Sequence, residues 1–323
     1  MKDRALSPAR LSLSIILGGV LAAPLVIALA ALSDIGHRWA DILSQFTGPA
    51  LVIAVAVLMV GALTRLGLVS ATAAGVCAAV LLAGWPQWAP PRGAAPQHAP
   101  GFTLYSANLH RDNADISAIA RSIAASDADV VVLVEVGPAP AAALDVVLAG
   151  YPYRAVRGPV DQPAGNVLTV IASRRPLEDL RLEAPGLSIE AARVETAIGP
   201  VTVAGAHLTR PWPYQIQWEQ IRQAERLSSW ARSTPGPVIA AGDFNSVSSA
   251  RIGRLIQSEG GLVPAPGWPG TWPSRLPALA GITIDQVYRT PDLALTDRRL
   301  GRPTGSDHRP VITRFVRATP PAP

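Results

Sequence analysis

Six apolar segments of the sequence each carry a polar or ionisable side chain at or near one end. These side chains are Asn108, Glu135, His207, Asp243 with Asn245, Asp285, and Asp307 with His308. A carboxylate that adjoins several consecutive apolar residues is costly to bury without a partner. We therefore expect the six ends to converge on one shared site that holds a cation.

The donor atoms of this expected site are hard. The carboxylates of Glu135, Asp243 and Asp307 and the amides of Asn108 and Asn245 offer oxygen. Such donors suit Mg²⁺, with Mn²⁺ as an alternative, and do not suit a structural zinc ion. The imidazoles of His207 and His308 remain available for proton transfer or for binding phosphate.

Each of these residues also has a structural interpretation when it is taken alone. Asp243 and Asn245 flank Phe244 in a turn-like setting, and such residues are common in turns. Trp272, in Gly-Thr-Trp-Pro, is typical of a packed loop aromatic and less often faces a substrate. Asp285 is the hardest to dismiss, because it lies inside an apolar segment and needs a buried partner. The joint pattern favours function for the whole set.

The segments around these residues have the patterns of strands and helices. Strands are predicted over 102–108, 129–135, 166–172, 201–207, 238–242, 282–288 and 310–316, and helices over 113–125, 214–232 and 249–258. Strands that recur with helices between them indicate an α/β or α+β domain with a sheet core. We place this domain at residues 101–317, which is long enough for a substantial core.

Three uncharged runs precede the domain, at residues 11–32, 42–64 and 66–91. A helix needs about 20 apolar residues to cross the hydrocarbon of a bilayer. These runs are apolar on every face, so we predict transmembrane helices at about 11–32, 42–64 and 66–88. A cleaved signal peptide is the alternative for the first run, but the run is long and two more follow it.

The few charges around these runs predict an orientation. Lys2, Arg4, Arg10 and Arg65 would share the cytoplasmic side, whereas the loop with Asp34, Arg38 and Asp41 has a net charge of −1. The positive-inside rule then predicts a multi-pass protein of the inner (plasma) membrane with an extracytoplasmic (periplasmic) domain. Residues 89–100 are rich in proline and are predicted to be a semi-extended linker. The tail 318–323 is predicted to be disordered.

Composition excludes two classes of protein. The chain has 323 residues, of which 49% are hydrophobic and 16% charged, so it is too apolar for intrinsic disorder. Cys77 is the only cysteine, which excludes a disulfide scaffold. Residues 93–317 hold 22 basic and 20 acidic residues, a balance that permits a nucleic-acid partner without indicating one. No obligate protein partner is evident.

The order of these residues and motifs resembles the endonuclease/exonuclease/phosphatase superfamily, which includes DNase-I-like nucleases, sphingomyelinases and inositol polyphosphate phosphatases. The resemblance covers roughly residues 101–317. Its specific part is Gly-Asp-Phe-Asn at 242–245, followed by Ser-Asp-His-Arg-Pro at 306–310. The resemblance implies a four-layer sandwich of two packed mixed sheets with outer helices. Together with the preceding apolar runs, it looks like a membrane-anchored branch.

The resemblance also implies roles for individual residues. Glu135 would be the main metal ligand with Asn108 beside it, and Asp307 could join them. Asp243 would orient or deprotonate the attacking water. Asn245 and His207 would hold the phosphate oxygens. Asp285 would orient His308. His308 would then stabilise the charged transition state or act as a base. Val134 and Gln286 depart from residues that are frequent in the family.

We therefore expect a membrane-anchored, Mg²⁺-dependent phosphoester hydrolase that acts by in-line attack of water. Its substrate could be a nucleic acid, a phospholipid head group or a small phosphoester. The alternative is a catalytically silent, membrane-tethered binding or sensor module that keeps the same fold. Loss of Asp243 or His308 would be the signature of such a module, and both residues are present.

Overall fold

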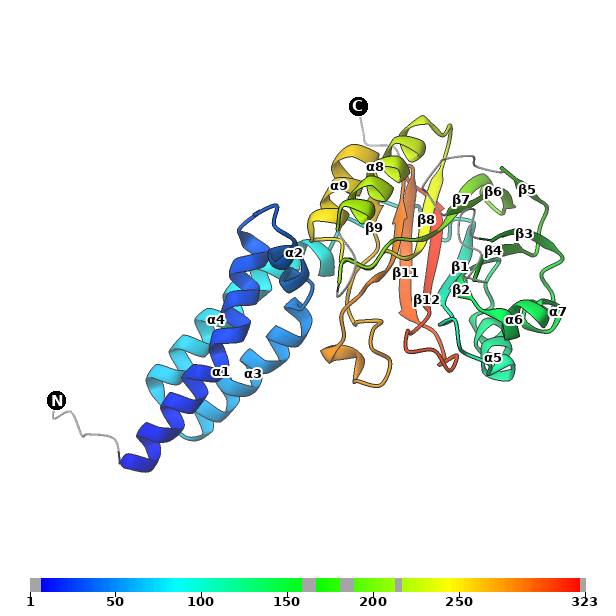
Figure 1. The fold of residues 1–323 in the computed structure, drawn as a ribbon. Coiled ribbons are helices and arrows are strands. Elements are labelled where there is room, and N and C mark those ends of the chain that lie inside the picture. The colour runs from blue at the N-terminus through cyan, green and yellow to red at the C-terminus, as the bar shows by residue number, and fades with distance from the viewer. Residues whose placement is uncertain (1–6, 159–166, 181–188, 213–216, 320–323) are drawn as a thin grey trace.

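The computed structural model describes residues 7–158, 167–180, 189–212 and 217–319. A slender helical bundle lies at the N-terminal end and joins a larger domain built on two sheets (Figure 1). The predicted tail lies mostly outside the described residues, as do Asn166 and the first residues of the helix predicted from 214.

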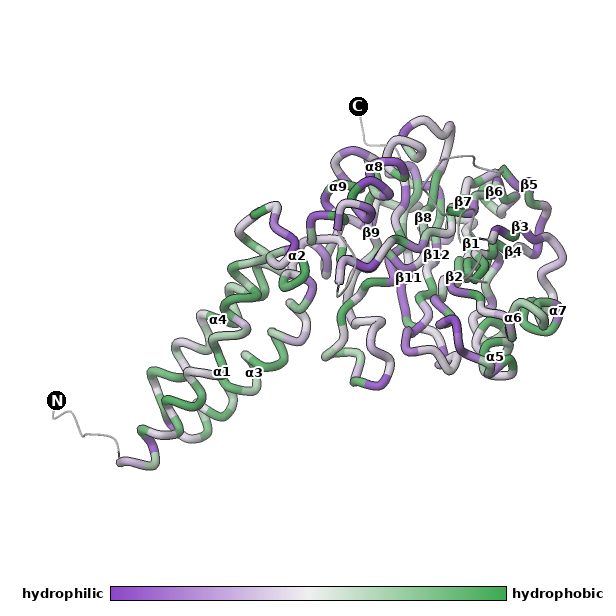
Figure 2. The backbone as a smooth tube through the Cα atoms, viewed as in Figure 1, coloured by the Kyte–Doolittle hydropathy of each residue, from purple (hydrophilic) through white to green (hydrophobic). Residues whose placement is uncertain are grey.

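The described bundle contains four helices, of which α1, α3 and α4 share an apolar core that includes Leu21, Ala54 and Val80. Their bounds are α1 (Pro8–Leu32), α2 (Arg38–Ser44), α3 (Thr47–Leu63) and α4 (Gly67–Trp88). Helices α1 and α4 are long and apolar enough to cross a membrane, and α2 with α3 makes a third candidate span that is bent by 58°. The second predicted span, at about 42–64, coincides with α3 and with the last three residues of α2. The apolar character runs the length of the bundle (Figure 2).

The domain contains two mixed sheets, as predicted, and each has six strands. The first has the order β11-β12-β1-β2-β4-β3 and the second β5-β6-β7-β8-β10-β9. Each sheet has one central parallel pair, β1 with β2 and β7 with β8, and all other neighbours are antiparallel. The strands are β1 (Gly101–Asn108), β2 (Val130–Val136), β3 (Tyr153–Arg157), β4 (Leu168–Ser173), β5 (Leu177–Asp179), β6 (Ile189–Thr196), β7 (Gly199–His207), β8 (Val238–Asp243), β9 (Val263–Pro264), β10 (Asp285–Arg289), β11 (Leu293–Leu300) and β12 (Val311–Arg317).

The inner faces of the sheets share a core of side chains such as Phe102, Val132 and Ile239. Helices cover the two outer faces. Helix α5 (Ile116–Ser126) and α7 (Leu144–Val147) pack on the first sheet, and α8 (Gln217–Ser233) and α9 (Arg251–Gly260) pack on the second. The short α6 (Pro138–Ala142) precedes α7, and a 3₁₀ turn, η1 (Ala278–Ala280), lies beside the bundle.

The structure also departs from the predicted elements. Strands β3, β5, β6, β9 and β11 were not predicted, nor were α2, α6 and α7. The strand predicted over 282–288 begins at Asp285, so this carboxylate stands at a strand end. Residues 89–100 form no helix or strand, yet they are tied to the domain. The carbonyl of Pro91 accepts a hydrogen bond from Arg289 (2.7 Å), and that of Arg92 accepts one from the Leu295 amide (2.7 Å).

The bundle is bonded directly to the domain through α2. Asp41 is buried, and its carboxylate accepts hydrogen bonds from the backbone N–H of Arg251 (2.7 Å) and from the side chain of Gln217. Four residues further on, Gln45 reaches the carbonyl of Asn245 at 3.5 Å. The contact with the bundle therefore extends to the Gly-Asp-Phe-Asn segment.

Candidate active site

The polar strand ends meet at one end of the sandwich because both parallel pairs point the same way. Asn108 and Glu135 lie at the carboxyl ends of β1 and β2, and His207 and Asp243 lie at those of β7 and β8. Asp285 starts β10 directly opposite Asp243 in the antiparallel ladder. Residues that follow parallel strands share one sheet edge, and here the edges of the two sheets face each other.

Backbone distortion aims Glu135 into this space. The pairing of β2 with β4 is irregular between Leu133 and Val136, and Glu135 has a φ of +51°. Such a bulge redirects a side chain that the strand alternation would otherwise place elsewhere. A left-handed conformation at a non-glycine residue is strained, and such strain is concentrated at functional sites.

The turn after β8 is equally constrained. Gly242 has a φ of +141°, and a Cβ atom there would lie 2.1 Å from the carbonyl oxygen of Ala206. Asn245 has a φ of +48°, and its backbone N–H donates to Asp243 Oδ1 at 2.8 Å. Glycine is required at 242 because only glycine lets β8 approach β7 so closely at that backbone geometry.

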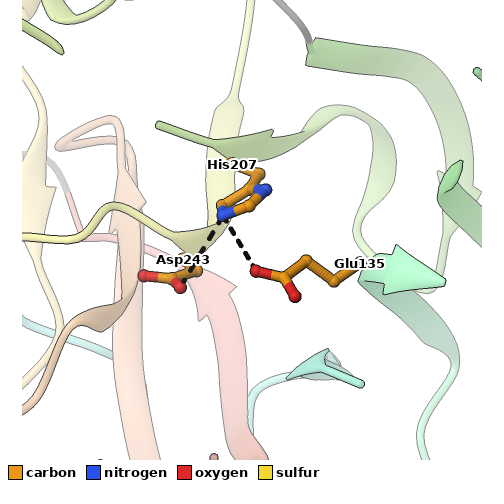
Figure 3. Close-up of side chains that lie close together, drawn as sticks. All are labelled: Glu135, His207 and Asp243. Carbon is orange, nitrogen blue, oxygen red and sulfur yellow. Dashed lines mark ion pairs between the residues drawn. The ribbon is translucent and has the colours of Figure 1, made fainter. Parts of the chain in front are cut away.

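Three of the gathered side chains could hold a metal ion. The Nε2 atom of His207 lies 3.2 Å from Glu135 Oε1 and 3.9 Å from Asp243 Oδ2 (Figure 3). One ligand atom from each residue lies within 4.8 Å of the other two. Two carboxylates this close repel each other unless a cation or donated protons lie between them. The donor set of two oxygens and one imidazole nitrogen fits a divalent cation and does not specify which one.

Asn108 holds the two carboxylates from the side. Its Nδ2 atom donates to Glu135 Oε1 and to Asp243 Oδ2, each at 3.0 Å, and its Oδ1 accepts from the His110 N–H at 2.8 Å. The resemblance implied a metal ligand at this position. In the structure its amide nitrogen faces the two carboxylates, and the His110 N–H engages one of the two lone pairs of its oxygen.

A second group of titratable side chains adjoins the first. His308 Nδ1 lies 2.9 Å from Asp285 Oδ2, and His308 Nε2 lies 3.9 Å from Asp243 Oδ2. The side chain of His308 is only 8% exposed. A nitrogen in contact with a carboxylate carries the proton, so Nδ1–H donates to Asp285 and Nε2 faces Asp243.

The charges of this cluster shift one another's pKa values. Burial opposes the charged form of His308, but the Asp285 carboxylate outweighs burial and raises the pKa of His308 to about 10. Burial raises the pKa of Asp243 to about 6, against the opposing effect of His308. Burial also opposes ionisation of Glu135, but His207 and Asn108 outweigh it and lower the pKa of Glu135. At neutral pH His308 is therefore a cation beside two carboxylates.

The remaining predicted site residues line the rim. Asp307 is half exposed, and its Oδ2 accepts from Trp272 Nε1 at 3.0 Å, whereas its Oδ1 lies 3.9 Å from His308 Nε2. It belongs to neither group of metal-capable side chains among the described residues. Asn245 donates its Nδ2 to the carbonyl of Leu208 at 2.9 Å. Trp272, Asn245 and Asp307 all line a cleft of about 710 Å³ that contains Glu135, His207, Asp243 and His308.

Two glutamines support the site and were not predicted. Gln220 of α8 donates to the carbonyls of Phe244 (2.9 Å) and Asn245 (3.1 Å), and Gln45 of the bundle also reaches Asn245. Gln220 is fully buried, and the available sequence signal was its position next to Ile221 and four residues before Ala224, on the apolar face of an amphipathic helix. Gln45 lies within an uncharged run that predicts a membrane span, so no sequence signal pointed to it.

Comparison with known proteins agrees with this geometry. A model described as the Endonuclease/Exonuclease/phosphatase family matches residues 101–308. The chain belongs to this family of hydrolases. A comparison with curated proteins found no match.

Solved structures share the fold. An endonuclease/exonuclease/phosphatase from Beutenbergia cavernae DSM 12333 is 24% identical, with a TM-score of 0.53, and covers 69% of this chain and 73% of its own. A humanized D. rerio TDP2 is 20% identical, with a TM-score of 0.52 and coverages of 67% and 98%. The Bacteroides thetaiotaomicron mannosyl-6-phosphatase Bt3783 is 18% identical, with a TM-score of 0.50 and coverages of 67% and 99%.

Proposed function

We propose that the protein is a membrane-anchored, divalent-metal-dependent phosphoester hydrolase in which water attacks phosphorus in line with the leaving oxygen. The observation that carries the proposal is the gathering of Glu135, His207 and Asp243 in one cleft, with the His308–Asp285 pair beside them. We take Mg²⁺ as the ion, with Mn²⁺ as the alternative. Glu135 would hold the ion, with His207 and Asp243 beside it, and the ion would offset the charge of the phosphoryl group.

Asp243 is the residue placed to handle the attacking water. Its Oδ1 is engaged by the Asn245 N–H, whereas its Oδ2 points toward Asn108, His207 and His308. The pKa of Asp243 is raised to about 6 by burial, so its carboxylate is ionised at neutral pH and is a better proton acceptor than an exposed aspartate. Oδ2 therefore orients the water and accepts its proton.

His308 supplies a fixed positive charge. Asp285 holds Nδ1–H, and in our account Nε2–H, on the side of the ring near Asp243 and Asp307, would donate to a phosphoryl oxygen in the cleft. Because the pKa of His308 is raised to about 10, the ring donates a hydrogen bond to the transition state and does not act as a base. Asn245 and His207 line the same cleft and contact the other phosphate oxygens in our account.

The bundle supplies the anchor. Arg38 lies at the domain end of the bundle together with Asp34 and Asp41, whereas Arg10 and Arg65 meet at the end far from the domain, where the side chain of Arg10 donates to the carbonyls of Thr64 and Arg65. The positive-inside rule then favours a cytoplasmic location for that end and an extracytoplasmic domain. Large apolar side chains such as Ile15, Leu68 and Leu82 are exposed on the bundle, as lipid-facing residues would be.

The test uses the full-length chain in lipid nanodiscs with an aryl phosphodiester, with Mg²⁺ or Mn²⁺ and with a chelator. We expect metal-dependent turnover that falls on the order of 10²-fold or more in Asp243→Asn and in His308→Gln. Asp297→Asn, at an exposed carboxylate paired with Arg299, is the matched control and should retain activity. Turnover that neither chelator nor these variants change would contradict the site. Absence of turnover on every phosphoester tried would favour the silent module.

A further inference from the structure

The end of the bundle that meets the domain is marked by tryptophans. Trp39 of α2 is 53% exposed and Trp85 near the end of α4 is 64% exposed. Tryptophan is enriched where a membrane meets water, because its ring is apolar while its N–H is polar. With Arg10 and Arg65 at the opposite end, these two rings mark the level of the bilayer surface next to the domain.

A loop of the domain is fixed at this level. Trp268 packs against Trp88 at the end of α4, with ring centroids 5.7 Å apart, and its Nε1 donates to the carbonyl of Leu279. Gly281 in the same loop lies against Gly48 at the start of α3. The segment 274–280 therefore lies beside the end of the bundle that meets the domain, where its 3₁₀ turn contacts α3.

The chemistry of this segment suits a lipid surface. It reads Ser-Arg-Leu-Pro-Ala-Leu-Ala, with Leu276 43% and Leu279 55% exposed and with Arg275 also exposed. Exposed leucines beside a basic residue are typical of segments that insert shallowly among lipid head groups. The other large exposed apolar residues described in the domain are Val146, Tyr153, Val156 and Trp218. Trp218 lies in the first turn of α8, next to Gln217, which contacts Asp41 of the bundle.

The same segment is bonded to the catalytic loop. Arg309 donates to the carbonyls of Ser274 and Leu276, and the Ser274 N–H donates to the carbonyl of Asp307 at 2.7 Å. Trp272, just before the segment, lines the cleft together with Ile282 just after it and Gln45 of the bundle. One wall of the cleft is thus built from the elements nearest the inferred bilayer surface.

We infer that segment 274–280 rests in the head-group layer and that the cleft takes its phosphoester from a lipid of the adjoining leaflet. The occupant is the bilayer itself, because the segment continues the surface of the candidate spans. This inference rests on the proposed function for its substrate, and on geometry alone for the docking. A phosphate at head-group depth would reach Glu135 and His308 past Trp272 and Gln45, without leaving the membrane surface.

Docking can be measured without activity. In a Cys77→Ala background of the full-length chain, Leu279→Cys carries an environment-sensitive fluorophore in nanodiscs that contain spin-labelled phospholipid. We expect strong quenching at position 279 and little at the matched Val146→Cys, which lies on α7 at the far side of the domain (Figure 1). Equal quenching at the two positions would overturn the docking.

Substrate choice is measured with Leu276→Asp/Leu279→Asp in the same nanodiscs, with Val146→Asp as control. Loss of two inserted leucines should lower hydrolysis of a bilayer phospholipid by about ten-fold or more. Hydrolysis of a soluble aryl phosphodiester should stay unchanged. Equal loss on both substrates, or no loss on the lipid, would overturn the inference while the hydrolase stands. Quenching without turnover of either substrate would contradict the proposed function and leave the docking intact.

Discussion

Asp243 and Asp285 lie directly opposite each other across the β8–β10 ladder, and the ring of His308 contacts both sides of this pair. Its Nδ1 lies 2.9 Å from Asp285 and its Nε2 lies 3.9 Å from Asp243. Two carboxylates on facing strands would repel each other in a buried setting. The imidazolium between them offsets that repulsion. It also places a positive charge at the wall of the cleft.

The Asp285→Asn variant tests the origin of this charge. An amide cannot stabilise the imidazolium as a carboxylate does, so the pKa of His308 should fall from about 10 toward its ordinary value. Activity that needs the charged ring is present below the pKa of His308 and is lost as the pH rises through it. The alkaline limb of kcat/KM should therefore move to lower pH in the variant, with a loss of about 10²-fold near neutral pH. An unmoved limb would contradict the role of Asp285.

Asn108→Ala tests how the carboxylates are held. The amide donates to both Glu135 and Asp243, so its loss frees the two carboxylates to separate. Because groups that orient metal ligands contribute about 10–100-fold to affinity, we expect Mn²⁺ to bind more weakly by about that factor. The measurement is titration of Mn²⁺ followed by electron paramagnetic resonance. The conservative Asn108→Gln serves as comparison, and wild-type affinity in the alanine variant would exclude this role.

Gly242→Ala tests the turn after β8. The added Cβ would lie 2.1 Å from the Ala206 carbonyl at a φ of +141°, so we expect a loss of about 4 kcal/mol or more in the free energy of unfolding. Gly236→Ala is the matched control, because its φ is +80° and no atom lies within 4 Å of the added Cβ. It should lose only about 1–2 kcal/mol, from backbone strain. Equal losses in thermal unfolding would contradict the close packing at Gly242.

Glu190 of β6 gives a pH dependence of stability away from the cleft. Burial, and then the nearby Asp179, raise the pKa of Glu190 to about 7, from an ordinary value of 4.5. Between pH 4.5 and about 7 the folded state keeps this proton whereas the unfolded state releases it. The contribution of Glu190 to the free energy of unfolding is therefore complete below pH 4.5 and is lost as the pH rises through about 7. Glu190→Gln should therefore be more stable than the wild type at pH 8, by on the order of 2 kcal/mol. Thermal unfolding at pH 5 and pH 8 tests this, and a difference that does not grow with pH would contradict it.

The elements that could be predicted are those whose side chains are almost all apolar, because such a composition indicates burial. The β-branched run of β2 and the apolar β8 are buried on both faces, so composition alone indicates strands. Strand β6 was missed because Glu190, Arg193 and Glu195 interrupt its apolar residues. Strand β11, at the edge of its sheet, was missed because only its first three residues are apolar and buried, while charged residues follow them.

Spatial details of the site lie beyond sequence patterns. The end-of-strand positions of Glu135 and Asp243 could be inferred, because strand ends are visible in hydropathy. The +51° φ of Glu135 depends on the bulge against β4, which is a property of the paired strands. The break between α2 and α3 is similar only in part. Asp41 and Gln45 bond the domain at this point, and the local sequence also favours a break, because Pro49 in the first turn of α3 has no N–H with which to continue a helix from Gln45.

The most direct test of the central claim is anomalous diffraction from crystals of the full-length chain soaked in Mn²⁺. Our account predicts one strong peak in the space among Glu135, His207 and Asp243, within bonding distance of the Glu135 carboxylate, and its loss in Glu135→Gln. A peak at some other position, or none there at saturating Mn²⁺, would contradict the claim that these side chains form the metal site of the hydrolase.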